Sequence, residues 1–129
     1  MNILDIIKNR RSVREFKDLE IPEKAIDVLF EALRWAPSAG NLQSRKFYFV
    51  FNEAIRNKLA QTGLRHDFVS FIVRAPLVVV ACADLRIASR YKERGNNLYC
   101  IQDTAASVQN LLLAAHDQGL GTCWVGRGR

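Results

Sequence analysis

The sequence contains few of the residues from which most protein-based catalytic sites are built. Its 129 residues include only two histidines and three cysteines, and no two cysteines have the CxxC spacing. An odd number of widely spaced cysteines indicates reduced thiols rather than a disulfide framework or a zinc site. HExxH, GxSxG, GxGxxG and Walker sequences are also missing. We therefore expect no metal, and if the protein is an enzyme, we expect a bound organic cofactor to supply the reactive group.

Long hydrophobic runs are missing as well. No apolar stretch approaches the ~20 residues that cross a bilayer. The first eleven residues mix acidic, basic and apolar side chains and lack a small-residue cleavage site. We therefore expect no membrane span and no signal peptide, and a cytoplasmic protein. The length fits a single domain, residues 1–129, and a composition of 49% hydrophobic and 25% charged residues is ordinary for a globular chain.

Basic residues outnumber acidic ones by 19 to 13, which gives a formal net charge of +6. The excess is densest at Lys8, Arg10, Arg11, Arg14 and Lys17. Such a surplus indicates an anionic partner, for example nucleic acid, an acidic membrane or a phosphorylated ligand. A nucleic-acid-binding domain is the lesser alternative, because the sequence has no helix-turn-helix spacing, no zinc ligands and no basic strand studded with aromatics.

Hydrophobic periodicity predicts helices over residues 3–10, 22–36, 53–63 and 98–118, and strands over 46–51 and 76–83. Both strands are so continuously apolar that we expect them to be covered on both faces. The second helix has a core stripe of Ile26, Leu29, Phe30 and Leu33. In the last helix the stripe comprises Leu98, Ile101, Ala105, Val108, Leu112 and Ala115. Further apolar residues in its later half indicate burial on more than one side, within one domain or in a dimer.

The end of the chain and the element order complete this outline. Gly119 is predicted to cap the last helix, and a strand-like stub follows it. Residues 84–97 are polar and poorly patterned, and residues 66–74 are ambiguous. Helices that alternate with buried strands favour a layered α/β or α+β domain in which the second strand and the final stub are central.

Three short segments have the chemistry to bind a ligand, although each also has a purely structural explanation. RRSVR, residues 10–14, can surround a phosphate with guanidinium groups, or it is a solvated charge run. PSAGNLQ, residues 37–43, can read the polar edge of a flat heterocycle, or it is a loop before a strand. GLGTCWVG, residues 119–126, lets the backbone approach a planar ligand, or it is a helix cap that leads into a core strand.

Taken together and in this order, the three segments resemble the nitroreductase family of flavin enzymes. A VVVACAD strand and the helix sequence DTAASVQNLLLAA lie between the second and third segments, and the resemblance runs from Ile3 to Gly126. It implies an α+β fold, a three-layer α-β-α sandwich with a mainly antiparallel central sheet, incomplete at the C-terminus of this chain. It also implies a homodimer with FMN in each of two clefts at the subunit interface, the last helix being a main dimer contact.

The resemblance further implies which residues bind the cofactor. The phosphate, the ribityl chain and one edge of the ring would be held by Arg10, Arg11, Ser12 and Arg14. The opposite subunit would contribute Pro37, Ser38, Ala39, Asn41 and Gln43. The flavin would be lined by Trp124, Val125 and Gly126, with a backbone N–H from the end of this stretch directed at N5. No side chain needs to act as acid or base, because flavin N5 carries the hydride.

The implied reaction is a ping-pong hydride transfer. NADH or NADPH would reduce the flavin and leave, and a nitroaromatic, a quinone or a similar electron-poor acceptor would then be reduced in the same place. Residues 84–97 would shape the choice of acceptor. Family chains continue beyond the GTCWVG segment with a further strand and an arm, so we expect this chain to be truncated or a fragment. A catalytically silent dimer or flavin carrier is therefore the alternative function.

Overall fold

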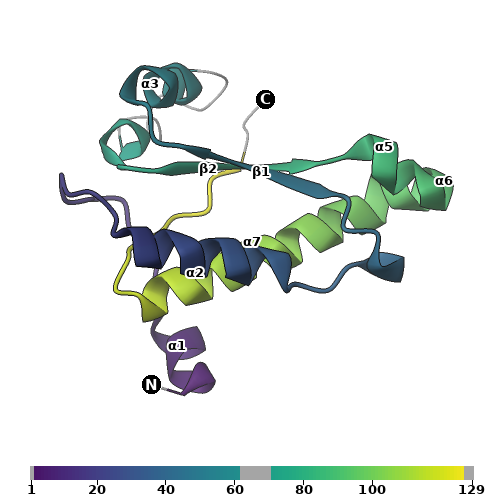
Figure 1. The fold of residues 1–129 in the computed structure, drawn as a ribbon, viewed down its shortest axis with the longest axis horizontal. Helices are drawn as coiled ribbons and strands as arrows, with labels where there is room; N and C mark the ends of the chain where they lie inside the picture. The colour runs from purple at the N-terminus through teal and green to yellow at the C-terminus, as the bar shows by residue number, and fades with distance from the viewer. Residues whose placement is uncertain (1, 62–70, 127–129) are drawn as a thin grey trace.

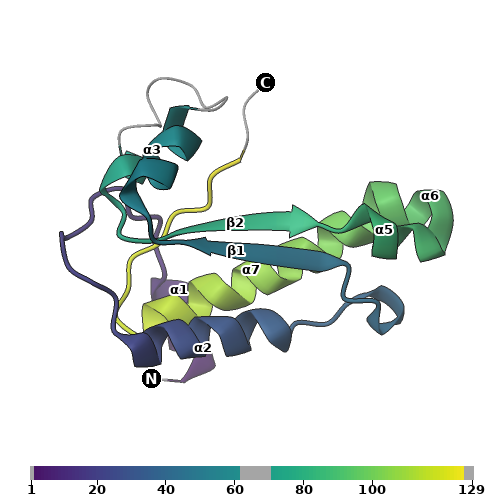
Figure 2. The ribbon, with the colours of Figure 1, turned by 45° about the horizontal axis from the view of Figure 1, so that its top comes forward.

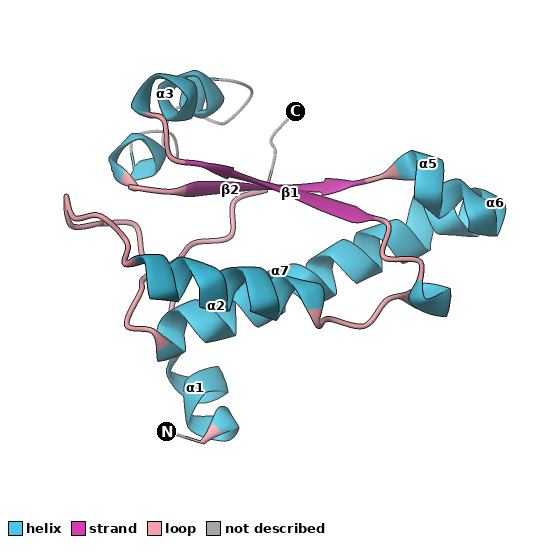
Figure 3. Cartoon of the chain, in the orientation of Figure 1, coloured by secondary structure: helices cyan, strands magenta, loops and turns pink. Residues whose placement is uncertain are grey.

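The computed structural model describes residues 2–61 and 71–126, whose elements are arranged in three layers (Figure 1). The strands are β1 (Arg45–Val50) and β2 (Val78–Ala83). The helices are α1 (Ile3–Asn9), α2 (Glu23–Arg34), α3 (Glu53–Gln61), α5 (Leu85–Ala88), α6 (Lys92–Arg94) and α7 (Cys100–Asp117). Short turns are η1 (Ala39–Asn41), η2 (Ser89–Tyr91) and the π-type η3 (Gly95–Tyr99). Figures 2 and 3 show α2 and α7 on one side of the strands and α3 on the other.

Local sequence explains where the first and last helices begin and end. The side chain of Asn2 caps α1, since its Oδ1 accepts the Asp5 N–H at 3.0 Å. At the end of α7, Gly119 has a φ of +78°. The Gly119 N–H donates to the His116 carbonyl at 3.0 Å and the Leu120 N–H to the Ala115 carbonyl at 2.8 Å. This is the Schellman arrangement, so the cap predicted at Gly119 is confirmed.

The two strands pair antiparallel, from Arg45 opposite Ala83 to Val50 opposite Val78. Side chains of β1 alternate: Phe47 and Phe49 pack against α2 and α7, whereas Tyr48 on the other face is half exposed. The Lys46 ammonium lies 5.2 Å from the Tyr48 ring centre. The expectation that β1 is covered on both faces is therefore wrong within the described residues, because α3 lies only over the end of the strand (Figure 2).

The main core lies between α2 and α7 and beneath the sheet. Leu29 and Leu33 of α2 pack with Leu111, Leu112 and Ala115 of α7. Phe30, expected in this core, is 44% exposed, although its ring stacks on Phe49 with centroids 4.3 Å apart. A second cluster joins Ala60 to Phe71 and Ile72 on the side of α3, with Phe16 and Cys123 packed against it.

The first half of α7 differs from the prediction. Ile101 is 61% exposed, and the buried face instead carries Cys100, Asp103 and Ser107. The Ser107 hydroxyl donates to the Leu33 carbonyl at 2.9 Å, so this face is held partly by polar contacts. Apolar periodicity cannot detect such contacts. The helix also begins after η3, whose wider π turn changes which residues face inward relative to a continuous α-helix.

The final segment does not form the expected central strand within residues 2–61 and 71–126. The sheet there has two strands, and residues 120–126 contribute an isolated parallel bridge between Ser12 and Thr122. β2 begins two residues after Pro76, which has no N–H to donate to a strand partner. Residues 71–74 of the ambiguous segment are helical, and residues 66–70 lie outside the described residues, as does Gly63, the expected end of α3.

Substituting Ser107 is expected to destabilise the fold more than substituting a matched surface serine. Ser107 is fully buried, so Ser107→Ala leaves the Leu33 carbonyl without a partner and lowers the free energy of unfolding by about 1–2 kcal/mol. Ser89 also donates its hydroxyl to a carbonyl, that of Arg86 at 2.9 Å, but in solvent. Urea unfolding measures both variants. Equal midpoint shifts for Ser107→Ala and Ser89→Ala would contradict the assignment of Ser107 to the α2–α7 interface.

Candidate functional site

The structure brings the first and third candidate segments together. The Val13 N–H donates to the Thr122 carbonyl at 2.8 Å, next to the bridge between Ser12 and Thr122. Gly121 lies directly against Val13, where an added Cβ would come within 2.9 Å of the valine side chain. The close approach of these two backbones therefore depends on glycine at this position. Residues 10–14 and 119–126 thus form one continuous surface.

The three arginines of this surface differ in their contacts. Arg11 donates from Nη1 to the carbonyls of Lys8 and Arg10, at 2.6 and 2.8 Å, so its guanidinium is directed at the end of α1. Within residues 2–61 and 71–126, the side chains of Arg10 and Arg14 make no hydrogen bond or ion pair. Ser12 and Arg14 are exposed. Two guanidinium groups and a hydroxyl are therefore available to an anion, a donor set that suits phosphate.

The second candidate segment is a tightly turned loop. Gly40, Asn41 and Gln43 have φ values of 57°, 56° and 54°, in the left-handed region. The Gln43 N–H donates to the Ser38 hydroxyl at 3.0 Å, and the Gln43 side-chain amide donates to Asn41 Oδ1 at 3.1 Å. Gly40 is required here, because an added Cβ would lie 1.8 Å from the Tyr91 hydroxyl. The loop therefore presents exposed side-chain amide groups, and its backbone conformation depends on glycine at position 40.

This loop lies at the opposite end of α7 from the arginine surface (Figures 1 and 2). The Ala39 N–H bonds the Asp103 carboxylate near the start of α7, whereas the third segment begins at Gly119 after the helix ends. At 1.5 Å per residue, the helix from Asp103 to Gly119 spans about 24 Å. One chain therefore does not bring all three candidate segments to one small ligand.

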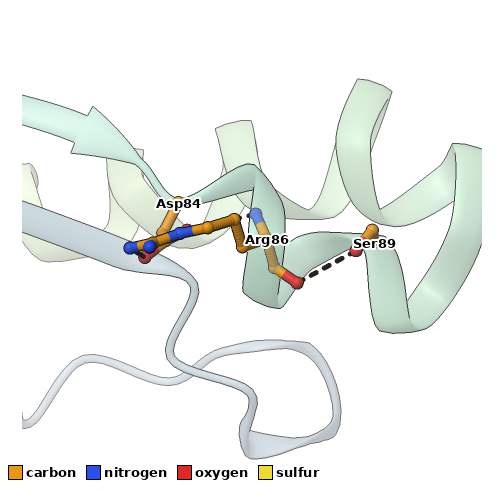
Figure 4. A network of polar contacts seen from close by, with 3 residues as sticks. All are labelled: Asp84, Arg86 and Ser89. Carbon is orange, nitrogen blue, oxygen red and sulfur yellow. Dashed lines mark hydrogen bonds and ion pairs between the residues drawn. The ribbon is translucent and has the colours of Figure 1, made fainter.

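Residues 84–97 form a succession of short helical turns rather than a regular element. Asp84 caps α5, with its Oδ1 accepting the Arg86 N–H at 3.1 Å, and its Oδ2 lies 3.2 Å from Arg86 Nη2 (Figure 4). The Ser89 hydroxyl donates to the Arg86 carbonyl at 2.9 Å. The hydrogen bond from the Arg86 side chain, with smaller help from its N–H and its charge, lowers the pKa of Asp84.

Titration of Asp84 is expected to occur below its usual pKa of 3.8. Because the pKa is lowered by folding, the ionised carboxylate stabilises α5 at neutral pH, and this contribution is lost as the pH falls through the folded-state pKa. A carboxyl-carbon NMR titration measures the midpoint. Arg86→Met is expected to raise that midpoint toward 3.8, and a midpoint that is unchanged in Arg86→Met would contradict the role of the guanidinium.

Sequence reasoning missed two residues that shape the loop of residues 37–43. Asp103 is only 7% exposed, and both its carboxylate oxygens accept the Ala39 N–H. Arg45 donates to the carbonyls of Ala36, Pro37 and Asp103. For Asp103, the signal in the sequence was an acidic residue with no other Asp, Glu, Lys or Arg between positions 98 and 116. Among the described residues, no three His, Cys, Asp or Glu side chains are grouped as metal ligands, and no helix is long and apolar enough to span a membrane.

The chain belongs to the nitroreductase family, because the model of that family matches residues 7–66 and 66–128. A protein of Methanothermobacter thermautotrophicus, provisionally named NADH dehydrogenase/NAD(P)H nitroreductase, is 35% identical over 98% of this chain. The FMN reductase (NADPH) of Bacillus subtilis is 26% identical over 97% of it. The match covers 61% of the first relative and 54% of the second, so the chain spans little more than half their length.

Solved structures show the same fold. A nitroreductase family protein from Clostridium novyi superimposes with a TM-score of 0.89 over all of this chain and 72% of its own, at 23% identity. A provisionally assigned nitroreductase from Desulfovibrio desulfuricans, solved in complex with FMN, gives 0.84 at 29% identity, over 97% of this chain and 68% of that one. The α+β nitroreductase fold expected from the sequence is thereby confirmed.

Proposed function

We propose that this chain is the flavin-binding part of an FMN-dependent NAD(P)H oxidoreductase that works as a homodimer. The observation that carries this proposal is the separation of about 24 Å along α7 between the amide-rich loop and the arginine surface. Two copies with antiparallel α7 helices would bring the loop of one copy to the arginine surface of the other. The names of the relatives, an NADPH-dependent FMN reductase and an FMN-bound nitroreductase among them, support the same cofactor.

The residues of the arginine surface fit FMN chemically. Arg10 and Arg14 offer guanidinium groups that have no partner among residues 2–61 and 71–126, and phosphate accepts hydrogen bonds from such groups in bidentate fashion. Trp124 is 53% exposed and lies two residues after Thr122, which forms the bridge to Ser12, so it adds a flat apolar surface to the same segment pair. Gly126 has open space where a Cβ would lie, so its backbone is accessible to a ligand. The two adjoining segments thus offer charged groups for a phosphate and an apolar surface for a flat ring.

The proposed dimer also accounts for apolar side chains that the single chain leaves in solvent. Ile3, Leu4 and Ile7 of α1 are exposed, and Trp35 at the end of α2 is 79% exposed. An open groove lined by α1, α2 and α7 runs past Trp35 and Leu113. Apolar patches of this kind mark interaction surfaces. We propose that the second copy covers this groove, together with exposed Ile101 of α7.

When bound, FMN would supply hydride chemistry, accepting from NADH or NADPH and passing electrons to a nitroaromatic, a quinone or a similar electron-poor acceptor. The residues of the chain would bind the cofactor and orient it. Arg10 and Arg14 would hold the phosphate, Trp124 and Val125 would exclude water from one side of the ring, and Ser38 and Asn41 of the partner copy would offer hydrogen bonds at its edge. Arg11, Ser12, Pro37, Ala39, Gln43 and Gly126 complete the proposed contacts. The protein's contribution is thus positioning and electrostatics, without an acid or base side chain.

Anaerobic spectroscopy on the purified chain tests the proposal. We expect the chain to take up FMN with a shifted visible spectrum, and NADH or NADPH to bleach the bound flavin. Added nitroaromatic or quinone should restore the colour in a second step that requires no nicotinamide, as a ping-pong reaction demands. Colour without bleaching would replace this function with that of a flavin carrier, and no uptake of FMN at all would refute the proposed function.

A further inference from the structure

A polar cluster of buried Asp103 and partly buried Arg45 contacts the backbone of the loop of residues 37–43. Asp103 contributes a carboxylate from the first turn of α7, and Arg45 contributes a guanidinium from the first residue of β1. Neither belongs to the residues proposed to touch the flavin. Burying such groups is costly unless their polar atoms are matched, so the partners of Asp103 and Arg45 show what the cluster holds in place.

The contacts of this cluster converge on the backbone that precedes Gly40. Both oxygens of Asp103 accept the Ala39 N–H, at 3.1 and 3.2 Å. The two terminal nitrogens of Arg45 donate to the carbonyls of Ala36 at 2.5 Å and Pro37 at 2.8 Å. A further bond at 3.3 Å, to the main-chain carbonyl of Asp103, ties Arg45 to α7. Three successive peptide units, from Ala36 to Ala39, are therefore fixed to both β1 and α7.

Ser38 lies between these fixed points, and Asn41 follows two residues after Ala39. Within the loop, the Asn41 N–H donates to the Ser38 carbonyl at 3.0 Å and the Leu42 N–H to the Ala39 carbonyl at 3.2 Å, which form the single turn η1. Gly40 and Asn41 have left-handed φ values, so this turn does not continue as a regular helix. The exposed side of the loop is further held by the contact of Gly40 with Tyr91 and by the bonds of Gln43, and all of these contacts except the one with Tyr91 are local to residues 38–43. Without the cluster, the loop would sample other conformations, and the population ready for a ligand would fall.

We propose that Asp103 and Arg45 are positioning residues of the flavin site, which hold the backbone of residues 36–39 so that Ser38 and Asn41 are preset for the cofactor bound by the partner copy. This inference rests on the proposed function. The guanidinium is suited to the role because its planar fork reaches two carbonyls at once, whereas lysine offers a single point charge. The Asp103 carboxylate makes charge-assisted bonds to a backbone N–H, which are stronger than neutral ones.

Amide hydrogen exchange on the flavin-free chain tests the positioning itself. In Asp103→Ala the peptide that contains residues 37–43 should exchange at least about tenfold faster, while the core amides of α2 keep their rates. Asp103→Asn keeps one acceptor oxygen, so the exchange rate of the loop should stay within about threefold of that in the unaltered chain. Glu53→Ala is the matched control, because it removes an exposed carboxylate from the first turn of α3. Unchanged exchange of the loop in Asp103→Ala would overturn the proposal.

Arg45→Lys provides a second variant if Asp103→Ala does not fold. It keeps the charge and loses the fork, so exchange of the loop should rise severalfold without a change in the core amides. Loop exchange equal to that of the unaltered chain, or a uniform rise over the whole chain, would overturn the proposal.

FMN titration tests the link to the cofactor. Asp103→Ala should raise the Kd for FMN about 10- to 100-fold, because the ready loop population falls by that factor. In the background of the double variant Ser38→Ala and Asn41→Ala the same substitution should add less than about twofold, since Asp103 acts through these two residues of the loop. Additive effects would identify a merely structural role and overturn the inference. Failure of the unaltered chain to bind FMN would refute the proposed function, and with it the flavin role, even if the exchange result stands.

Discussion

Two variants that each fail to hold FMN are expected to recover binding when they are mixed. The first carries Arg10→Ala and Arg14→Ala, and the second carries Ser38→Ala and Asn41→Ala. If each site takes its arginines from one copy and its loop from the other, every mixed dimer contains one intact site and one site that lacks both sets. Random pairing at equal amounts should then restore about a quarter of the sites of the unaltered protein, because half of the dimers are mixed.

The expected size of this effect follows from the contacts removed. Losing two charge-assisted phosphate contacts should raise the Kd for FMN by at least about 100-fold in the first variant, and losing two neutral hydrogen-bonding side chains should raise it about 10-fold or more in the second. Each variant alone should therefore lose its FMN on desalting. The copies are unfolded together and refolded, and differently tagged copies allow the mixed dimer to be isolated. Quenching of FMN fluorescence then counts the intact sites. A mixed dimer that binds no FMN would contradict a shared site, as would a single variant that binds normally by itself.

Arg14→Ala is expected to weaken FMN binding far more than Lys17→Ala. Both side chains are exposed, and both substitutions remove one positive charge within four residues of sequence. The long-range attraction of the chain for an anion therefore falls equally in the two variants. Of the two, only Arg14 is next to Val13, whose N–H donates a hydrogen bond to the Thr122 carbonyl in the segment of residues 119–126. We expect the Kd to rise about 10- to 100-fold for Arg14→Ala and less than about threefold for Lys17→Ala.

The salt dependence of binding serves as the control for this comparison. Isothermal titration at two ionic strengths separates a direct contact, which survives salt, from diffuse attraction, which is screened over about 10 Å at 0.1 M salt. Equal losses of affinity in the two variants, or losses that disappear at high salt, would return residues 10–14 to the interpretation of a solvated charge run.

Short-range signals in the sequence predicted the elements well, because their physical causes are local. Gly119 forms the predicted cap, since a left-handed residue after a helix is a property of a few neighbouring peptides. The bounds of α1, α2, β1 and β2 agree with the expected ranges to within a few residues. The periodicity that placed Leu29 and Leu33 in the core of α2 was also correct.

The predictions from the sequence were wrong or incomplete where parts of the chain that are distant in sequence contact one another. Ile101 was expected inside and is exposed, because the inward face of α7 is set by polar bonds from Ser107 to Leu33 and from Asn110 to Ala32. Residues 119–126 were expected to be a strand, yet they meet the chain at Ser12 through a single bridge. Asp103 and Arg45 escaped notice because their role is to bond backbone groups remote in sequence.

By itself the sequence determined the family, the helices and strands, and the chemistry of three segments, since those properties depend on residue type and local spacing. The tertiary structure alone decided which segments meet. It paired residues 10–14 with 119–126 and set the loop of residues 37–43 at the far end of α7. The length of a rigid helix separates the loop from the arginines, and no pattern of neighbouring residues encodes that distance.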